Sequence, residues 1–125
     1  MVNRNYARGY IIERKAFKEL EEQGYFPIRS SGSHTKIDLV ALPTTKMKGR
    51  RVSNYPILAI QLKRVKGKYY SFEKEINEIK NIPLSKTING DEFIRKEIWI
   101  WRDRIKGIRK AGWIKQVILP TTLIK

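Results

Sequence analysis

Hydrophobic residues recur near the start of the chain at the spacing of one helical face, which predicts a helix over residues 6–23. The apolar positions on this face are Tyr6, Tyr10, Phe17 and Leu20. Gly24 follows as a typical C-terminal helix stop. A second, shorter helical stripe predicts a helix over about residues 71–81, which ends before Pro83.

Between and after these helices, apolar and polar residues follow the patterns of strands. The predicted strands cover residues 25–29, 37–42, 57–63, 96–102 and 113–119. The first of them contains Pro27, which cannot donate a backbone hydrogen bond, so we expect it at a sheet edge. The order of elements predicts one α/β domain over residues 1–125, with a mixed central sheet flanked by helices.

Polar residues break this pattern at three places: Glu13 on the first helix, Asp38 at the start of the second strand, and Gln61 with Lys63 on the strand ILAIQLK. Each has a simple structural explanation when taken alone. Glu13 fits the margin of the apolar stripe, and Asp38 fits a turn cap. Gln61 and Lys63 share one face of their strand and fit a strand end that emerges into water.

Together, the same residues predict a reaction centre. Antiparallel pairing of strands 37–42 and 57–63 places Asp38 near Gln61 and Lys63. We expect the first helix to pack over that face and to present Glu13 to the same place. Carboxylate and amide oxygens bind hard divalent cations, and an ammonium group stabilises charge that develops on a phosphate. This set of groups is typical of phosphodiester hydrolysis.

Charge points to the same class of substrate. The 125 residues include 27 Lys and Arg against 12 Asp and Glu, a formal charge of +15. A compact domain with this excess attracts nucleic acid. A membrane fits less well, because no apolar run reaches the roughly 20 residues needed to span one. The chain has no cysteine, which excludes disulfides and cysteine-based zinc sites. With no apolar N-terminal signal, we expect a cytoplasmic protein, or one in the host cytoplasm if it is viral.

Four elements in order carry a family resemblance: Glu13, the Gly32-Ser33 loop, Ile37-Asp38, and Gln61-x-Lys63. This arrangement resembles the signature of the PD-(D/E)xK nucleases, which have a restriction-endonuclease-like core. More narrowly, the chain is similar to archaeal Holliday junction resolvases, including those of archaeal viruses. The likeness covers the N-terminal half of the chain. The resemblance implies Mg²⁺-dependent paired nicking of four-way DNA junctions by a homodimer, in DNA recombination and repair, with Mn²⁺ able to substitute.

The resemblance also implies the roles of single residues. Glu13, Asp38 and Gln61 correspond to the metal ligands, and Lys63 corresponds to the catalytic lysine. Ser33 corresponds to a catalytic-loop residue, and Arg14 and Arg29 to phosphate contacts. Most of the family has Glu at the position of Gln61, so this chain has one negative charge fewer and we expect weaker metal affinity.

Three functions remain open on this basis: a junction resolvase, a related nuclease for flaps, ends or a sequence, and a DNA-binding protein with a degenerate site. The retained Asp38 and Lys63 favour an active enzyme. We expect two basic arms to contact the DNA backbone, the 46–51 loop and the 102–110 turn. The full set of expected nucleic-acid contacts is Arg14, Arg29, Lys36, Lys46, Lys48, Arg50, Arg51 and Arg64.

Aromatic residues on the second helix and on strand 96–102 have two explanations. Phe72, Trp99 and Trp101 fit either a dimer interface or core packing. His34 is the only histidine, and it fits either a proton carrier or a loop residue without a role.

Overall fold

The computed structural model describes residues 4–30, 36–47, 55–84, 87–88 and 91–118. The first element is the helix α1 (Arg4–Glu22), as the apolar spacing predicts. Gly24 ends it with φ at 98°, and the Tyr25 N–H donates to the Leu20 carbonyl at 3.0 Å. Because glycine is favoured at such a left-handed position, the sequence signal for the end of this helix is confirmed.

Five strands form the main sheet, in the order β1-β2-β3-β6-β7. They are β1 (Phe26–Arg29), β2 (Leu39–Leu42), β3 (Ile57–Val65), β6 (Ile94–Arg102) and β7 (Gly112–Ile118). The β3–β6 pair is parallel and the other pairs are antiparallel, so the sheet is mixed. The predicted α/β class and the edge position of the strand with Pro27 are confirmed. Two short strands, β4 (Thr87–Ile88) and β5 (Asp91–Glu92), pair separately.

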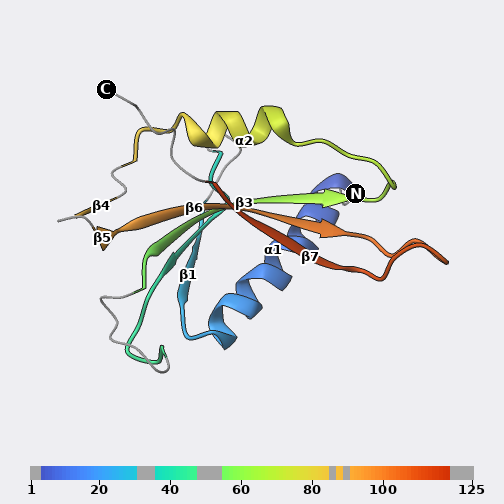
Figure 1. Ribbon diagram of the computed structural model, residues 1–125. Helices are drawn as coiled ribbons and strands as arrows, with labels where there is room; N and C mark the ends of the chain where they lie inside the picture. Colours follow the sequence, from blue (N-terminus) through green and yellow to red (C-terminus); the bar gives the residue numbers. More distant parts are fainter. Residues whose placement is uncertain (1–3, 31–35, 48–54, 85–86, 89–90, 119–125) are drawn as a thin grey trace.

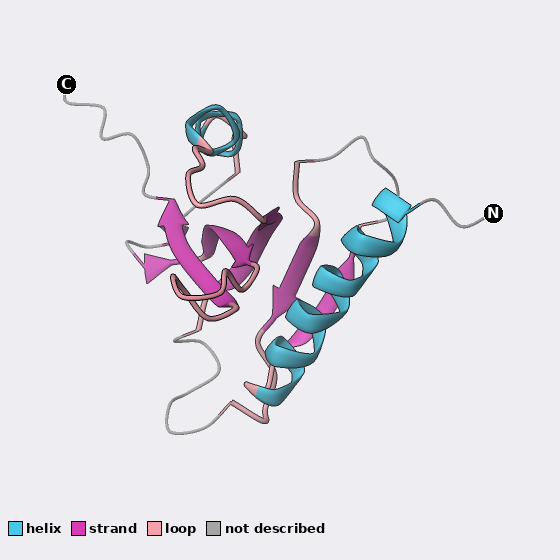
Figure 2. Cartoon of the chain, turned by 90° about the vertical axis from the view of Figure 1, so that its right-hand side faces the viewer, coloured by secondary structure: helices cyan, strands magenta, loops and turns pink. Residues whose placement is uncertain are grey.

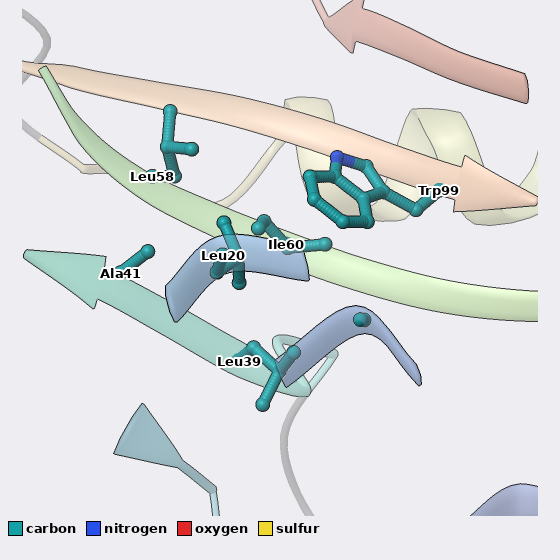
Figure 3. Close-up of a cluster of buried hydrophobic side chains, with 7 residues drawn as sticks. Leu20, Leu39, Ala41, Leu58, Ile60 and Trp99 are labelled. Atoms are coloured by element: carbon teal, nitrogen blue, oxygen red, sulfur yellow. The ribbon is translucent and has the colours of Figure 1, made fainter. Parts of the chain in front are cut away.

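The two helices cover opposite faces of this sheet (Figure 2). Side chains of α1 pack with one set of strand residues, among them Leu39, Ile60 and Trp99 (Figure 3). The second helix, α2 (Glu73–Lys80), packs through Ile79 against Ile98 and other residues of the opposite face. Each fully buried large side chain contributes roughly 1.5–3 kcal/mol, so both layers are needed for a stable fold.

The structure corrects one prediction about α1. Ile12, Ala16 and Leu20 face the core, whereas Tyr10 is 42% exposed. The side chain of Tyr6 lies outside the described part of the chain. Because two apolar stripes overlap on this helix, spacing alone does not select the one that the sheet covers.

The two explanations for the aromatic residues can now be separated in part. Trp99 is 1% exposed and donates through Nε1 to Glu97 Oε1 at 2.8 Å. Core packing is therefore confirmed for Trp99, and an interface role for it is wrong. Phe72 packs partly buried against the α2-side core, and Trp101 stacks edge-on against Trp113 with a centroid distance of 5.2 Å.

A buried charge joins α2 to the sheet. Lys96 on β6 is 2% exposed, and its ammonium donates to the carbonyls of Lys80 and Ile82 at 3.2 and 2.6 Å. These carbonyls lie at and just beyond the C-terminal end of α2, where helix carbonyls lack intrahelical partners and the helix dipole is negative. The ammonium therefore stabilises the end of α2 and anchors it to β6.

Strand direction decides which chain segments meet at each end of the sheet. Because β3 and β6 are parallel, they end at the same rim, on the side to which the β3 arrow points in Figure 1. β2 runs antiparallel to β3, so residue 38, just before β2, lies toward this rim. Arg29 pairs with Leu39 and ends β1 there too. We call this end of the sheet the β3 rim.

Candidate functional site

The β3 rim places Asp38 beside Gln61. Leu39 pairs with Ile60 in the antiparallel register of β2 and β3, so the preceding residue, Asp38, lies next to Gln61. The Asp38 N–H donates to the Ile60 carbonyl at 2.8 Å, and Asp38 Oδ2 accepts the Leu62 N–H at 2.7 Å. The predicted antiparallel pairing and the approach of Asp38 to the ILAIQLK strand are confirmed. The bond to Leu62 also shows that Asp38 continues the backbone ladder through its side chain.

The environment of Asp38 raises the pKa of its carboxyl above the ordinary value, mainly because burial penalises the charged form. The Leu62 N–H and the Lys63 ammonium oppose this rise, and the Glu13 carboxylate adds to it. Asp38 is therefore close enough to both Glu13 and Lys63 to sense their charges. It is the residue through which the three predicted charged groups are electrostatically coupled.

Gln61 is 5% exposed, and its Oε1 has no hydrogen-bond partner among the described residues. A buried polar atom without a partner costs roughly 1–3 kcal/mol and is unusual in a folded protein. Lys63 follows two residues later on the same face and is half-buried. The Gln61 amide oxygen is thus buried at the rim without a hydrogen-bond partner among the described residues, and the Lys63 ammonium lies on the same face.

The expected position of α1 over this face is wrong. Leu58, Ile60 and Leu62 pack with α1, so Gln61 and Lys63, by strand alternation, point to the side that α2 covers. The pKa of Glu78 on α2 is lowered mainly by its hydrogen bond with Lys36, and the Lys63 ammonium adds a smaller effect because it lies near that helix. Glu13 approaches Asp38 from the α1 side instead. The acid and the lysine meet at Asp38 from opposite faces of the sheet.

A cavity of about 190 Å³ opens beside Glu13, lined by Tyr10, Glu13, Arg14, Phe17 and Arg29. Arg29 Nε donates to Glu13 Oε1, and the guanidinium lies 5.5 Å from the centre of the Tyr10 ring. The cavity therefore joins one acid of the predicted site to the two arginines that the family resemblance implies as phosphate contacts. Arg14 is exposed at this cavity.

The other predicted contacts lie in different surroundings. Lys36 Nζ is 2.9 Å from Glu78 Oε2, and Arg64 forms two hydrogen bonds with Asp103, at 2.9 and 3.0 Å. Lys46 is exposed at the opposite end of the β2–β3 hairpin from Asp38, where the chain packs against Gly24. Ser33, His34, Lys48, Arg50 and Arg51 lie outside the described residues.

Two acidic partners of the predicted cations were not predicted from the sequence. Glu78 is a partly buried polar residue of α2, and Asp103 follows a strand, so neither breaks a local pattern. Both are recognised only through the cations that the fold brings to them, Lys36 and Arg64.

The donor set at the rim consists of two carboxylates and one amide. In the described part of the chain, no group of three or more His, Cys, Asp or Glu residues lies together in a way that could hold a metal ion. Glu13, Asp38 and Gln61 offer oxygen atoms only, which suits Mg²⁺ better than a softer metal. The unpartnered Gln61 oxygen and the desolvated Asp38 carboxyl both favour a cation as an additional partner.

Comparisons with protein-family models, with curated proteins and with solved structures gave no match for this chain. Across the described ranges, none of the helices combines the length and the apolar character required to cross a membrane.

Proposed function

We propose that this protein is a metal-dependent endonuclease that cuts four-way DNA junctions by paired nicks, acting as a homodimer. The observation that supports it best is the position of Asp38 beside Gln61 at the β3 rim, where the charges of Lys63 and Glu13 act on the Asp38 carboxyl from opposite faces of the sheet. These groups come from three elements that are distant in sequence. Their chemistry, oxygen donors beside an ammonium, matches the needs of phosphodiester hydrolysis.

In this proposal, Asp38 and Gln61 hold a divalent cation, Mg²⁺ or Mn²⁺, with Glu13 as a further oxygen donor. When bound, the ion supplies electrostatic stabilisation of the charge that develops on the scissile phosphate. Lys63 orients the attacking water and stabilises the same charge from the α2 side. Arg29 now pairs with Glu13, so this ion pair competes with the metal for the carboxylate. A phosphate that pairs with Arg29 would free the Glu13 carboxylate, which could then serve as a further oxygen donor.

Substrate binding rests on charge. The formal charge of +15 makes phosphate contacts the main source of affinity, with a steep dependence on salt. A four-way junction has near two-fold symmetry and needs two symmetric cuts, which a dimer with two sites provides. A preference for flaps, ends or a sequence is the alternative within the nucleases.

Two observations favour a second candidate function, a DNA-binding protein with a degenerate site. Gln61 supplies no negative charge, and the Glu13 carboxylate is engaged by Arg29. Both features lower the affinity of the site for a divalent cation.

One experiment separates these candidates. Labelled four-way junction, duplex and flap DNA are incubated with the protein in Mg²⁺, beside the variants Asp38→Asn and Lys63→Ala. Lys18→Ala, an exposed lysine of α1, is the matched control. Symmetric nicks on the junction, lost in both site variants and kept in the control, support the resolvase. Cutting of duplex or flap DNA instead supports another nuclease. Tight binding without metal-dependent cleavage supports the binding protein.

Size-exclusion chromatography with light scattering tests the dimer separately. A protein that stays monomeric at the concentrations used for cleavage, and that makes single unpaired nicks, contradicts the paired mechanism.

A further inference from the structure

Two loops leave the sheet side by side at the β3 rim (Figure 1). Val65 and Arg102 are paired at the ends of β3 and β6, so the segments 66–72 and 103–111 start next to each other. The Asp103 N–H donates to the Val65 carbonyl at 2.8 Å and continues this pairing by one residue. We call these two segments the rim loops.

Arginine side chains tie the rim loops together. Arg64 pairs with Asp103 through two hydrogen bonds and holds the pKa of that carboxyl below its ordinary value. Arg109 Nε donates to the Asp103 carbonyl at 2.8 Å, and its terminal nitrogen donates to the carbonyls of Val65 and Lys66 at 3.3 and 3.4 Å. A single guanidinium therefore links the starts of both loops, and we treat the rim loops as one unit.

This unit presents cations and an aromatic ring to the solvent. The exposed cations are Lys66, Lys68, Arg104, Lys106 and Lys110. None of the five forms an ion pair within the described part of the chain. Tyr69 is 85% exposed, and the Lys68 ammonium lies 5.5 Å from the centre of its ring. The one acid of the unit, Asp103, is already engaged by Arg64.

The exposed Tyr69 ring thus lies among cations that are accessible to a ligand. A planar base stacks on an aromatic ring, and the phosphates on either side of it bind lysine and arginine. Bases inside an intact duplex are not accessible for such stacking. The surface therefore matches nucleotides that are unpaired or unstacked.

We propose that the rim loops bind an unpaired nucleotide of the DNA substrate, with its base stacked on Tyr69 and its flanking phosphates held by the cations of both loops. The proposal rests on the proposed function, because it assigns this surface to the same DNA. Lys63 lies two residues before Val65, where the first loop begins. The unpaired nucleotide is thus held next to the site of cleavage, and the branch point of the DNA becomes the feature that directs the cut.

The test measures binding in EDTA, where cleavage does not occur. Fluorescence anisotropy compares a fully paired duplex with the same duplex carrying a central unpaired bubble, at one fixed salt concentration. The variants are Tyr69→Ala and Tyr69→Phe. Phe26→Ala is the matched control, because Phe26 is 60% exposed and lies at the opposite end of the sheet.

We expect Tyr69→Ala to weaken binding to the bubble about 5- to 150-fold, the range for loss of one base stack. Binding to the paired duplex stays the same, and Tyr69→Phe and Phe26→Ala bind both DNAs as the wild type does. A 2-aminopurine base in the bubble changes fluorescence on binding to the wild type and not to Tyr69→Ala. The double variant Lys106→Ala/Lys110→Ala lowers the salt slope by about 0.7 for each lost phosphate contact.

The proposal is overturned if Tyr69→Ala binds the bubble as tightly as the wild type, or loses equal affinity for both DNAs. It is also overturned if Tyr69 affects binding to phosphatidylserine vesicles and not to DNA. A wild-type protein that shows the Tyr69-dependent preference but cuts no junction in Mg²⁺ contradicts the nuclease and leaves this inference standing. Junction cleavage with no effect of Tyr69 on binding supports the nuclease and overturns this inference.

Discussion

Replacing Gln61 by Glu introduces the carboxylate that the nuclease signature has at this position. The surroundings of residue 61 determine how much this change lowers the stability of the fold. Gln61 is 5% exposed and lies beside Asp38. Opposite residues of an antiparallel pair have Cβ atoms roughly 5 Å apart. Two carboxylates at that separation repel by about 3 kcal/mol at an effective dielectric constant of about 20. Lys63, two residues away on the same face, returns about 2 kcal/mol at roughly 7 Å.

The repulsion and the attraction leave a net cost of about 1 kcal/mol, and burial of the charge adds to it. The total loss of stability has an upper limit, because the new carboxyl can take up a proton and become neutral. A glutamic acid that stays neutral in the folded protein at pH about 7 costs about 4 kcal/mol, given its ordinary pKa of about 4.3. We therefore expect Gln61→Glu to lower the free energy of unfolding by about 1–4 kcal/mol at neutral pH without metal. At pH about 5 the same limit falls to about 1 kcal/mol, because less work is needed to protonate the group.

Equilibrium urea unfolding in EDTA and in excess Mg²⁺ measures both effects. If Asp38 and residue 61 share a cation, Mg²⁺ stabilises the variant more than the wild type, by about 1.4 kcal/mol for each tenfold gain in affinity. Gln116→Glu is the matched control, since Gln116 is an exposed residue of the edge strand β7. Equal stability of both variants in EDTA refutes the charge repulsion at this buried position, and equal stabilisation by Mg²⁺ refutes a shared cation site.

Two further predictions concern the rim loops and the end of α1. Because Arg64 lowers the pKa of Asp103, the pair stabilises the fold above the ordinary pKa of the acid, and its contribution disappears as pH falls through the folded value. Asp103→Asn should therefore lower the free energy of unfolding by about 1 kcal/mol at neutral pH, and the stability of the variant should change less than that of the wild type between pH about 5 and 3, as followed by thermal unfolding. A constant difference in stability from the wild type down to pH about 2 contradicts this account. Gly24→Ala and Gly107→Ala both place a side chain at positive φ, but a Cβ at Gly24 lies 3.2 Å from the backbone of Lys46 and one at Gly107 meets nothing within 4 Å. We expect about 1 kcal/mol of destabilisation at Gly107 and a larger loss at Gly24 in urea unfolding, and equal losses argue against close packing at the α1 end.

The sequence predicts the elements of this fold well, because spacing and stop signals are local. The helix stop at Gly24, the edge strand with Pro27 and the long strand that holds Gln61 are all found in the structure. Antiparallel pairing of two adjacent strands also follows from their order, and it brings Asp38 to Gln61.

The features of the fold and of the site that the sequence does not predict depend on contacts between distant segments. The face of α1 that packs inward is decided by the sheet, and so Tyr10 is exposed while Ile12 is buried. The parallel pairing of β3 with β6 creates the neighbours of Arg64 and Arg109, and no local signal in the sequence indicates them. The exposed ring of Tyr69 could have been noticed, since the segment KGKYY interleaves basic and aromatic residues directly after β3.

The Lys96 ammonium beneath α2 also limits how that helix can move. A slide of α2 by one turn displaces its terminal carbonyls by about 5.4 Å from the ammonium and breaks two hydrogen bonds to a buried charge. Such a slide is therefore unfavourable, and the ammonium selects one axial register of α2 on the sheet. Glu78, the partner of Lys36, is thereby held at one position along the sheet, near Lys63.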